Sequence, residues 1–376
     1  MLDLSAIPLV DQHCHGLVAG PIDQPTFVGF LTESRHPLPH GASWFDTQLG
    51  FAVRAVCPPL LGLAPHASPE EYLARRAEMG AEEVTRRLLG STGISDYLID
   101  TGLDYGLDGS LLRPADLAAA SGGRAYEIVR LETVAEQVLR GGASAAGFAV
   151  AFARALDAAT RTAVAVKSIA AYRHGLDLDP ARPSAQQVRA AAGECLADLQ
   201  RTGAVRLTDP VLLRHLLWAG LDTRLPLQIH TGFGDTDLTL NRADPALLTP
   251  FLRAAQSTGV AVILLHGYPY HRNAAYLAHV FPHVYVDIGL TLNYVGTRAG
   301  AVLAEILELA PFAKTLFSTD AYGPPELYAI GTALFRKHLR HILTEWVTSD
   351  ACGLADAERV ARMIAGENAR NVYRLT

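Results

Sequence analysis

The chain has 376 residues, a length that allows one large barrel or two smaller domains. Hydrophobic residues make up 49% of it and charged residues 19%, a composition that excludes an intrinsically disordered protein. The formal net charge of −6 and the lack of an evident basic patch argue against nucleic acid as a partner.

The cysteines and the N-terminal segment bear on the cellular compartment. No two cysteines form a CxxC pair, so we expect neither a disulfide framework nor a zinc ribbon. The first residues lack the basic segment and the apolar stretch of a signal peptide. No apolar run approaches the ~20 residues that span a bilayer. We therefore expect a cytoplasmic protein with no membrane partner.

The first strand is predicted at residues 7–15. Glycine and proline then interrupt the pattern up to about residue 90, and an amphipathic helix is predicted at residues 69–89. Segments of this length between barrel elements are usually functional loops. We expect residues 16–92 to form a helical and loop insertion after the first strand, acting as a lid or facing the substrate.

Strand and helix patterns alternate through the rest of the chain. Further strands are predicted at residues 97–100, 125–131, 163–167, 226–230, 260–266, 284–287 and 314–318. Alternation of this kind predicts a parallel α/β sheet. Eight strand and helix units favour a closed (β/α)8 TIM barrel over an open doubly wound sheet. We expect residues 1–376 to form this single domain.

Candidate metal ligands follow the apolar runs in chain order. Parallel α/β barrels build their active sites from residues at the C-terminal ends of their strands. Five such positions predict a metal centre at the mouth of the barrel. The positions are His13 with His15, Lys167, His230, His266 and Asp320.

Each candidate ligand also has an ordinary structural interpretation. His13 and His15 are two apart on a strand, so they project to the same side, as a zinc site needs, but they could be unremarkable strand-end histidines. His230 and His266 could be hydrogen-bonded core histidines. Asp320 could cap a helix. Together, the residues supply the nitrogen and oxygen ligands of a catalytic zinc site with an open position for water.

Lys167 does not fit a simple cation site. A protonated ammonium group next to a divalent cation would be strongly repelled. The side chain could point away, bind an anionic substrate, or be neutral and carboxylated by carbon dioxide to bridge two metal ions. A salt-bridged barrel lysine is the structural alternative.

Substrate-binding candidates lie near the predicted strand ends. Tyr172 and Arg173 follow Lys167 closely, and an arginine can hold a carboxylate through two parallel hydrogen bonds. Tyr268 and Tyr322 follow two later strands. We expect these four side chains to face the pocket.

The ordered set of motifs resembles the amidohydrolase superfamily over essentially the whole chain. The resemblance rests on Asp11-Gln12-His13-Cys14-His15, Lys167, His230, His266 and Ser318-Thr319-Asp320. Residues 167–176 and 366–375 are similar to the amidohydrolase-related branch (amidohydrolase 2). That branch includes domains fused to glutamine-synthetase-like enzymes.

The resemblance implies a divalent metal cofactor, with zinc as the expected ion. His13, His15 and Asp320 would bind the more buried ion, and a carboxylated Lys167 would bridge it to a second one.

The number of metal ions stays open. His230 and His266 would bind the second ion in a two-metal site. In members with one metal, the ion is held by His13, His15, His230 and Asp320, and His266 contacts the substrate or the attacking water.

The implied activity is that of a metal-dependent amidohydrolase-type hydrolase. A metal-activated water would cleave an amide, lactone or ester bond of a small, carboxylate-bearing substrate. Asp320 would transfer the proton, and His266, if it is not a ligand, would orient the water or stabilise the oxyanion. The alternatives are a non-hydrolytic decarboxylase or uronate-type isomerase, and a catalytically silent metal-binding domain. A homo-oligomer is compatible with this kind of barrel.

Overall fold

The computed structural model describes residues 2–103 and 111–376. Its centre is a parallel sheet in which each strand pairs with the next one along the chain. The strands are β1 (Leu9–Cys14), β2 (Ile94–Asp100), β3 (Arg124–Arg130), β4 (Ala165–Ser168), β5 (Leu227–Thr231), β6 (Val262–His266) and β7 (Val284–Val286). These strands confirm the first seven predicted ones, with small differences at their ends.

The eighth predicted strand is an extended segment without a regular ladder. On one side the Leu316 N–H donates to the Val286 carbonyl of β7 (2.8 Å). On the other, the Gln12 N–H of β1 donates to the Phe317 carbonyl (3.2 Å). These hydrogen bonds are too few to form a strand, but they place residues 315–318 between β7 and β1. The ring is therefore closed, and the predicted (β/α)8 fold is confirmed.

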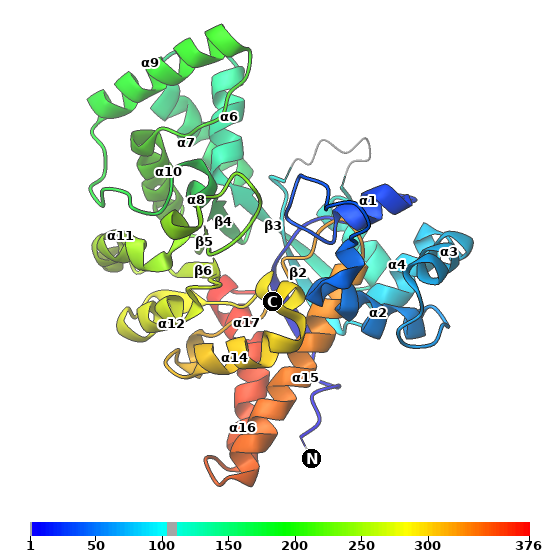
Figure 1. Cartoon of the computed structure of the whole chain (residues 1–376). Coiled ribbons are helices and arrows are strands. Elements are labelled where there is room, and N and C mark those ends of the chain that lie inside the picture. Colours follow the sequence, from blue (N-terminus) through cyan, green and yellow to red (C-terminus); the bar gives the residue numbers. More distant parts are fainter. Residues whose placement is uncertain (1, 104–110) are drawn as a thin grey trace.

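Residues between β1 and β2 form four helices that lie together on one side of the molecule (Figure 1). They are α1 (Gln24–Gly29), α2 (Gln48–Leu60), α3 (Pro69–Met79) and α4 (Ala81–Gly90). The prediction of a single helix at residues 69–89 is wrong, because Gly80 has φ 80° and ends α3 before α4 begins. Glycine adopts this conformation without the steric cost that other residues have.

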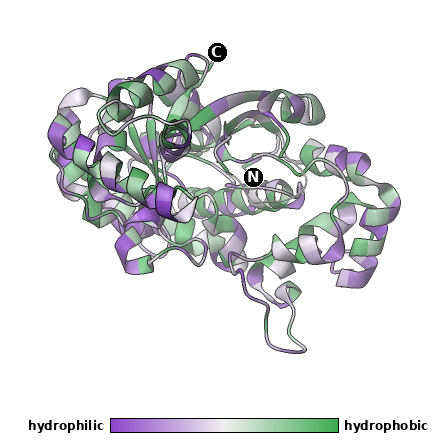
Figure 2. Cartoon of the chain, turned by 90° about the horizontal axis from the view of Figure 1, so that it is seen from above, coloured by the Kyte–Doolittle hydropathy of each residue, from purple (hydrophilic) through white to green (hydrophobic). Residues whose placement is uncertain are grey.

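The other helices follow the strands and cover the outside of the barrel. None of the described helices has the length and apolar character that crossing a membrane would need. Figure 2 shows that they carry both hydrophilic and hydrophobic residues, as expected for helices with one buried face. They are α5 (Pro114–Ser121), α6 (Leu131–Arg140), α7 (Phe148–Ala159), α8 (Ala170–Arg173), α9 (Ala185–Thr202), α10 (Pro210–Asp222), α11 (Thr249–Ala255), α12 (His271–Val280), α13 (Thr291–Val295), α14 (Ala299–Leu307), α15 (Glu326–Thr348), α16 (Leu354–Arg362) and α17 (Asn368–Tyr373).

The core has two parts. The larger one lies between the strands and the surrounding helices, and a smaller cluster fills the barrel interior. In the smaller cluster, Val10, Leu98 and Ile128 from β1 to β3 meet Ile263 of β6, and Tyr373 of α17 packs against them. A filled interior of this kind leaves the C-terminal ends of the strands as the open face of the barrel.

Gly323 packs against the insertion and should tolerate no side chain. It has φ 74°, and a Cβ atom there would collide with the Phe30 ring, which follows α1. We expect Gly323→Ala to lower the free energy of unfolding by about 2–4 kcal/mol, combining overpacking with left-handed strain. Gly122→Ala is the control, because Gly122 has φ 72° and no atom would lie within 4 Å of its Cβ. Equal losses in urea denaturation of the two variants would contradict the predicted collision.

Candidate metal centre

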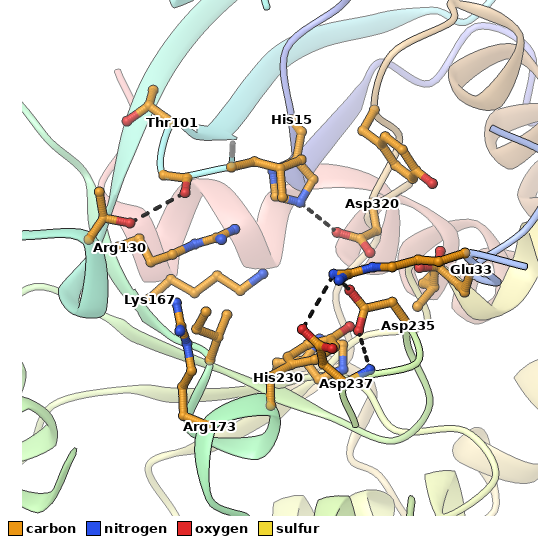
Figure 3. A pocket seen from close by; sticks show the side chains of 18 of the residues that line it. His15, Glu33, Thr101, Arg130, Lys167, Arg173, His230, Asp235, Asp237 and Asp320 are labelled. Carbon is orange, nitrogen blue, oxygen red and sulfur yellow. Dashed lines mark hydrogen bonds and ion pairs between the residues drawn. The ribbon is translucent and has the colours of Figure 1, made fainter. Parts of the chain in front are cut away.

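The six predicted metal ligands lie together at the C-terminal ends of the strands. Each ligand lies in the last two residues of its strand or just beyond the strand. Residues far apart in sequence therefore converge at one end of the barrel. They are His13 and His15 from β1, Lys167 from β4, His230 from β5, His266 from β6 and Asp320 after the eighth extended segment. His15, Lys167, His230 and Asp320 line a cavity of about 1020 Å³ (Figure 3).

Asp320 is the centre of the cluster. Its Oδ1 lies 3.0 Å from Nε2 of His13 and 3.3 Å from Nε2 of His15. Its Oδ2 lies 3.6 Å from Nε2 of His266. The ligand atoms of His13, His266 and Asp320 are close enough together to share one cation.

Neighbouring carbonyl oxygens set the tautomers of the first two histidines. His13 donates its Nδ1–H to Oε1 of Gln228 (2.8 Å), and His15 donates its Nδ1–H to the Asp100 carbonyl (3.1 Å). The Nε2 lone pairs of both rings therefore face Asp320. Metal-binding histidines show this arrangement, because the hydrogen bond at one nitrogen orients the other toward the ion.

Buried polar atoms without partners also fit a bound cation. Among the residues that the structure describes, Nε2 of His230, Nε2 of His266 and Oδ1 of Asp320 have no hydrogen-bond partner. Such atoms are costly unless a ligand satisfies them. Burial lowers the pKa of His13 to about 3 and lowers the pKa of His230 well below its ordinary value. The rings are then neutral at neutral pH, the form that binds metals.

The Asp320 carboxylate stays ionised in this site. Burial would raise the pKa of Asp320, but His266, His13 and His15 keep it well below its ordinary value. Neutral imidazoles with one carboxylate make a donor set that suits zinc or a similar divalent ion.

The backbone supports a functional role for two of these residues. His266 has φ 69° and Asp320 has φ 51°, the left-handed region that few residues other than glycine adopt. Such conformations cost about 1–3 kcal/mol each and cluster at active sites. Both residues are predicted ligands.

Lys167 points into the cluster. Its Nζ lies 2.8 Å from Nε2 of His13 and 3.5 Å from Oδ2 of Asp100. Burial lowers the pKa of Lys167. The Asp100 carboxylate is shared with Arg130, whose Nη2 lies 2.6 Å from it. Of the arrangements considered for Lys167, the one that points away from the metal site is contradicted.

Three of the four predicted substrate-binding residues line the cavity: Tyr172, Arg173 and Tyr322. The ring of Tyr172 lies 4.4 Å from the ring of His230, centroid to centroid. Tyr268 is not in the cavity wall, which corrects its predicted position. Consecutive left-handed residues at the end of β6, including Gly267 with φ 74°, turn the chain, and the Tyr268 ring stacks on His271.

Several residues of the site had not been predicted. Asp100 and Arg130 end strands β2 and β3, so their strand-end positions were a usable signal. Gln228 is a polar residue within an apolar strand, which also was a signal. Glu33, by contrast, comes from the insertion, and nothing in the sequence indicates that it reaches the cavity.

Gln228 should matter for metal affinity although it binds no metal. It accepts the His13 Nδ1–H, and its own amide donates to Oε1 of Gln12 (3.0 Å) and to the Tyr373 hydroxyl (2.8 Å). We expect Gln228→Leu to weaken zinc binding roughly 10-fold to 100-fold, because His13 loses its orienting partner. Competition with a chromogenic chelator measures this change. Gln200→Leu on α9 is the control, and the same affinity in both variants would exclude the orienting role.

The comparisons with known proteins agree with this geometry. A family model described as Amidohydrolase matches residues 107–375. Protein fluG of Emericella nidulans is 34% identical over 223 residues, which are 56% of this chain and 26% of that protein. The chain therefore spans about a quarter of this relative's length.

Solved structures show the same fold. A candidate metal-dependent hydrolase from Lactobacillus casei is 29% identical, with a TM-score of 0.87 over 99% of this chain and 96% of that one. A glucuronate isomerase from Caulobacter crescentus is 14% identical, with a TM-score of 0.65 over 99% of this chain and 92% of that one.

Proposed function

This chain belongs to the amidohydrolase family of metal-dependent enzymes, and on that premise we propose that it is a hydrolase of a small, carboxylate-bearing molecule. The bond cleaved is an amide C–N bond or a lactone or ester C–O bond. The observation that carries the proposal is the position of Asp320, whose carboxylate faces Nε2 of three histidines at the wall of a cavity.

Each residue of the site has its own role in the proposed reaction. A divalent cation, with zinc as the proposed ion, would supply charge that polarises the substrate carbonyl and acidifies the attacking water. His13, His15 and Asp320 would hold it, joined by His230 if the site takes a single ion. Asp320 accepts the proton of the attacking water and then donates it to the leaving group, which makes it the general base and general acid. His266 stabilises the negative charge that develops on the carbonyl oxygen, or binds a second ion.

Lys167 favours a two-metal site. A neutral amine reacts with carbon dioxide, and burial shifts Lys167 toward the neutral form. Carboxylation would convert the amine that now contacts Nε2 of His13 into an anionic ligand. Elemental analysis for two ions per chain, with a carbon dioxide adduct in the native mass spectrum, tests this assignment. One ion per chain without an adduct would contradict it.

The reaction type is tested by product analysis. Zinc-loaded protein is incubated with a panel of amides and lactones that carry a carboxylate, and with aromatic and uronic acids. We expect a free amine or an opened lactone as product. Released carbon dioxide or a sugar isomer, without hydrolysis, would contradict the proposal and establish a decarboxylase or an isomerase. Protein that binds no metal would indicate a silent domain.

A further inference from the structure

Most charged side chains of the cavity wall are neutralised by a neighbour. Asp235 and Asp237 in the loop after β5 both pair with Arg35 of the insertion, at 3.1 and 3.3 Å. Asp237 also pairs with Arg206 (3.3 Å). The two aspartates are thus balanced by two guanidinium groups, and these four side chains add no net charge to the cavity wall.

An arginine hydrogen-bond donor without a partner among the described residues lies near α6 and α8. Glu136 lies between two arginines, with Oε1 3.2 Å from Nη2 of Arg173 and Oε2 3.6 Å from Nη2 of Arg140. The buried carboxyl group of Glu132 also interacts electrostatically with Arg173. Oε1 of Glu136 also accepts the Leu207 N–H (2.9 Å). In the described part of the chain, the buried Nε of Arg173 has no hydrogen-bond partner. This corner can therefore donate hydrogen bonds to a further anion.

The opposite side of the cavity wall carries the carboxyl group of Glu33. Its Oε1 accepts a hydrogen bond from the Tyr294 hydroxyl (2.9 Å). No lysine or arginine among residues 2–103 and 111–376 forms an ion pair with it. Burial, and to a smaller extent the charge of Asp320, raises the pKa of Glu33 to about 7. A carboxylate in this position gains from any ligand that brings a positive charge.

The Arg173 donor and the Glu33 carboxyl group face each other across the candidate metal centre. Figure 3 shows Arg173 and Glu33 on opposite sides of the pocket, with Lys167 and Asp320 between them. All four side chains line the same cavity. A ligand with an anionic group at one end and a cationic group at the other would match both.

We propose that the substrate is a dipeptide-like zwitterion whose carboxylate binds Arg173 and Arg140 and whose ammonium group binds Glu33. Its central amide then lies at the metal ligands. This inference rests on the proposed hydrolysis, and it assigns a recognition role to the insertion, which supplies Glu33. Water adds across the amide C–N bond, so that the carbonyl carbon gains the hydroxyl and the amine nitrogen gains the proton.

Four related peptides test the charge requirement with the zinc-loaded full chain. Alanyl-alanine carries both charges, its amide lacks the carboxylate, its N-acetyl form lacks the ammonium group, and the N-acetyl amide lacks both. Chromatography of the cleavage products measures hydrolysis of the central amide, because the N-acetyl amide would yield N-acetylalanine and alaninamide, with no free alanine. Calorimetry on the zinc-loaded Asp320→Asn variant measures binding without turnover. We expect alanyl-alanine to bind roughly 10-fold or more tightly than either singly blocked form.

Variants then assign each charge to its residue. Glu33→Gln should weaken alanyl-alanine roughly 10-fold and leave the N-acetyl form unchanged, because that form has no ammonium group to lose. Arg173→Ala should weaken alanyl-alanine and leave its amide unchanged, and Arg173→Lys should restore part of the loss. Glu70→Gln, an exposed exchange on α3 of the same insertion, should change nothing.

The outcomes separate this inference from the proposed function. Cleavage of the central amide in all four peptides at similar rates would support hydrolysis and overturn the charge matching. Binding with the predicted dependence on Glu33 and Arg173, but without cleavage of the central amide, would support the charge matching and contradict hydrolysis. Failure of all four peptides to bind would overturn the dipeptide assignment.

Discussion

The Asp320→Asn variant should lose turnover almost completely while it keeps most of its metal. General acid and base catalysis contributes about 10²–10⁴-fold, and an amide cannot accept the proton of the attacking water. The asparagine oxygen still faces Nε2 of His13 and His15, so the donor set loses charge but not shape. Turnover of the substrate identified by product analysis, together with zinc content by elemental analysis, measures both effects.

The matched control for this exchange is Asp157→Asn on α7, whose side chain is 80% exposed and does not line the cavity. It should leave turnover and zinc content unchanged. Unchanged turnover in Asp320→Asn would eliminate the proposed proton transfer. Complete loss of zinc in that variant would show instead that Asp320 is needed mainly to hold the ion.

Removal of the metal should abolish activity and lower the thermal stability of the protein. The unsatisfied atoms on His230, His266 and Asp320 would then stay buried without a partner. An ion that binds the folded state alone stabilises it by about 4 kcal/mol when its concentration is 1,000 times its Kd. Dialysis against a chelator followed by thermal denaturation, with and without added zinc, measures the shift.

Recovery on adding back the metal is the control for irreversible damage. Zinc should restore both activity and melting temperature, whereas magnesium should restore little, since nitrogen ligands suit zinc far better. Full activity in metal-free protein, verified by elemental analysis, would contradict the proposed role of the metal centre.

The sequence was sufficient for the barrel and for the ligands that converge at its mouth. His15, Lys167, His230 and His266 each end a predicted strand, and the ends of parallel strands in a closed barrel must lie on one face. Once the strand order was inferred, this convergence followed from topology alone. Residue spacing within β1 likewise placed His13 and His15 on one side, because side chains alternate along a strand.

Only the tertiary structure decided which side chains surround those ligands. Gln228 orients His13 across 215 positions of sequence, and Glu33 reaches the cavity from an insertion that carries no strand or helix periodicity at that point. Tyr268 lies outside the cavity wall because left-handed backbone at the end of β6 turns the chain. Local patterns report periodicity along one segment, whereas the partners of a buried group depend on how distant segments pack, which no single segment encodes.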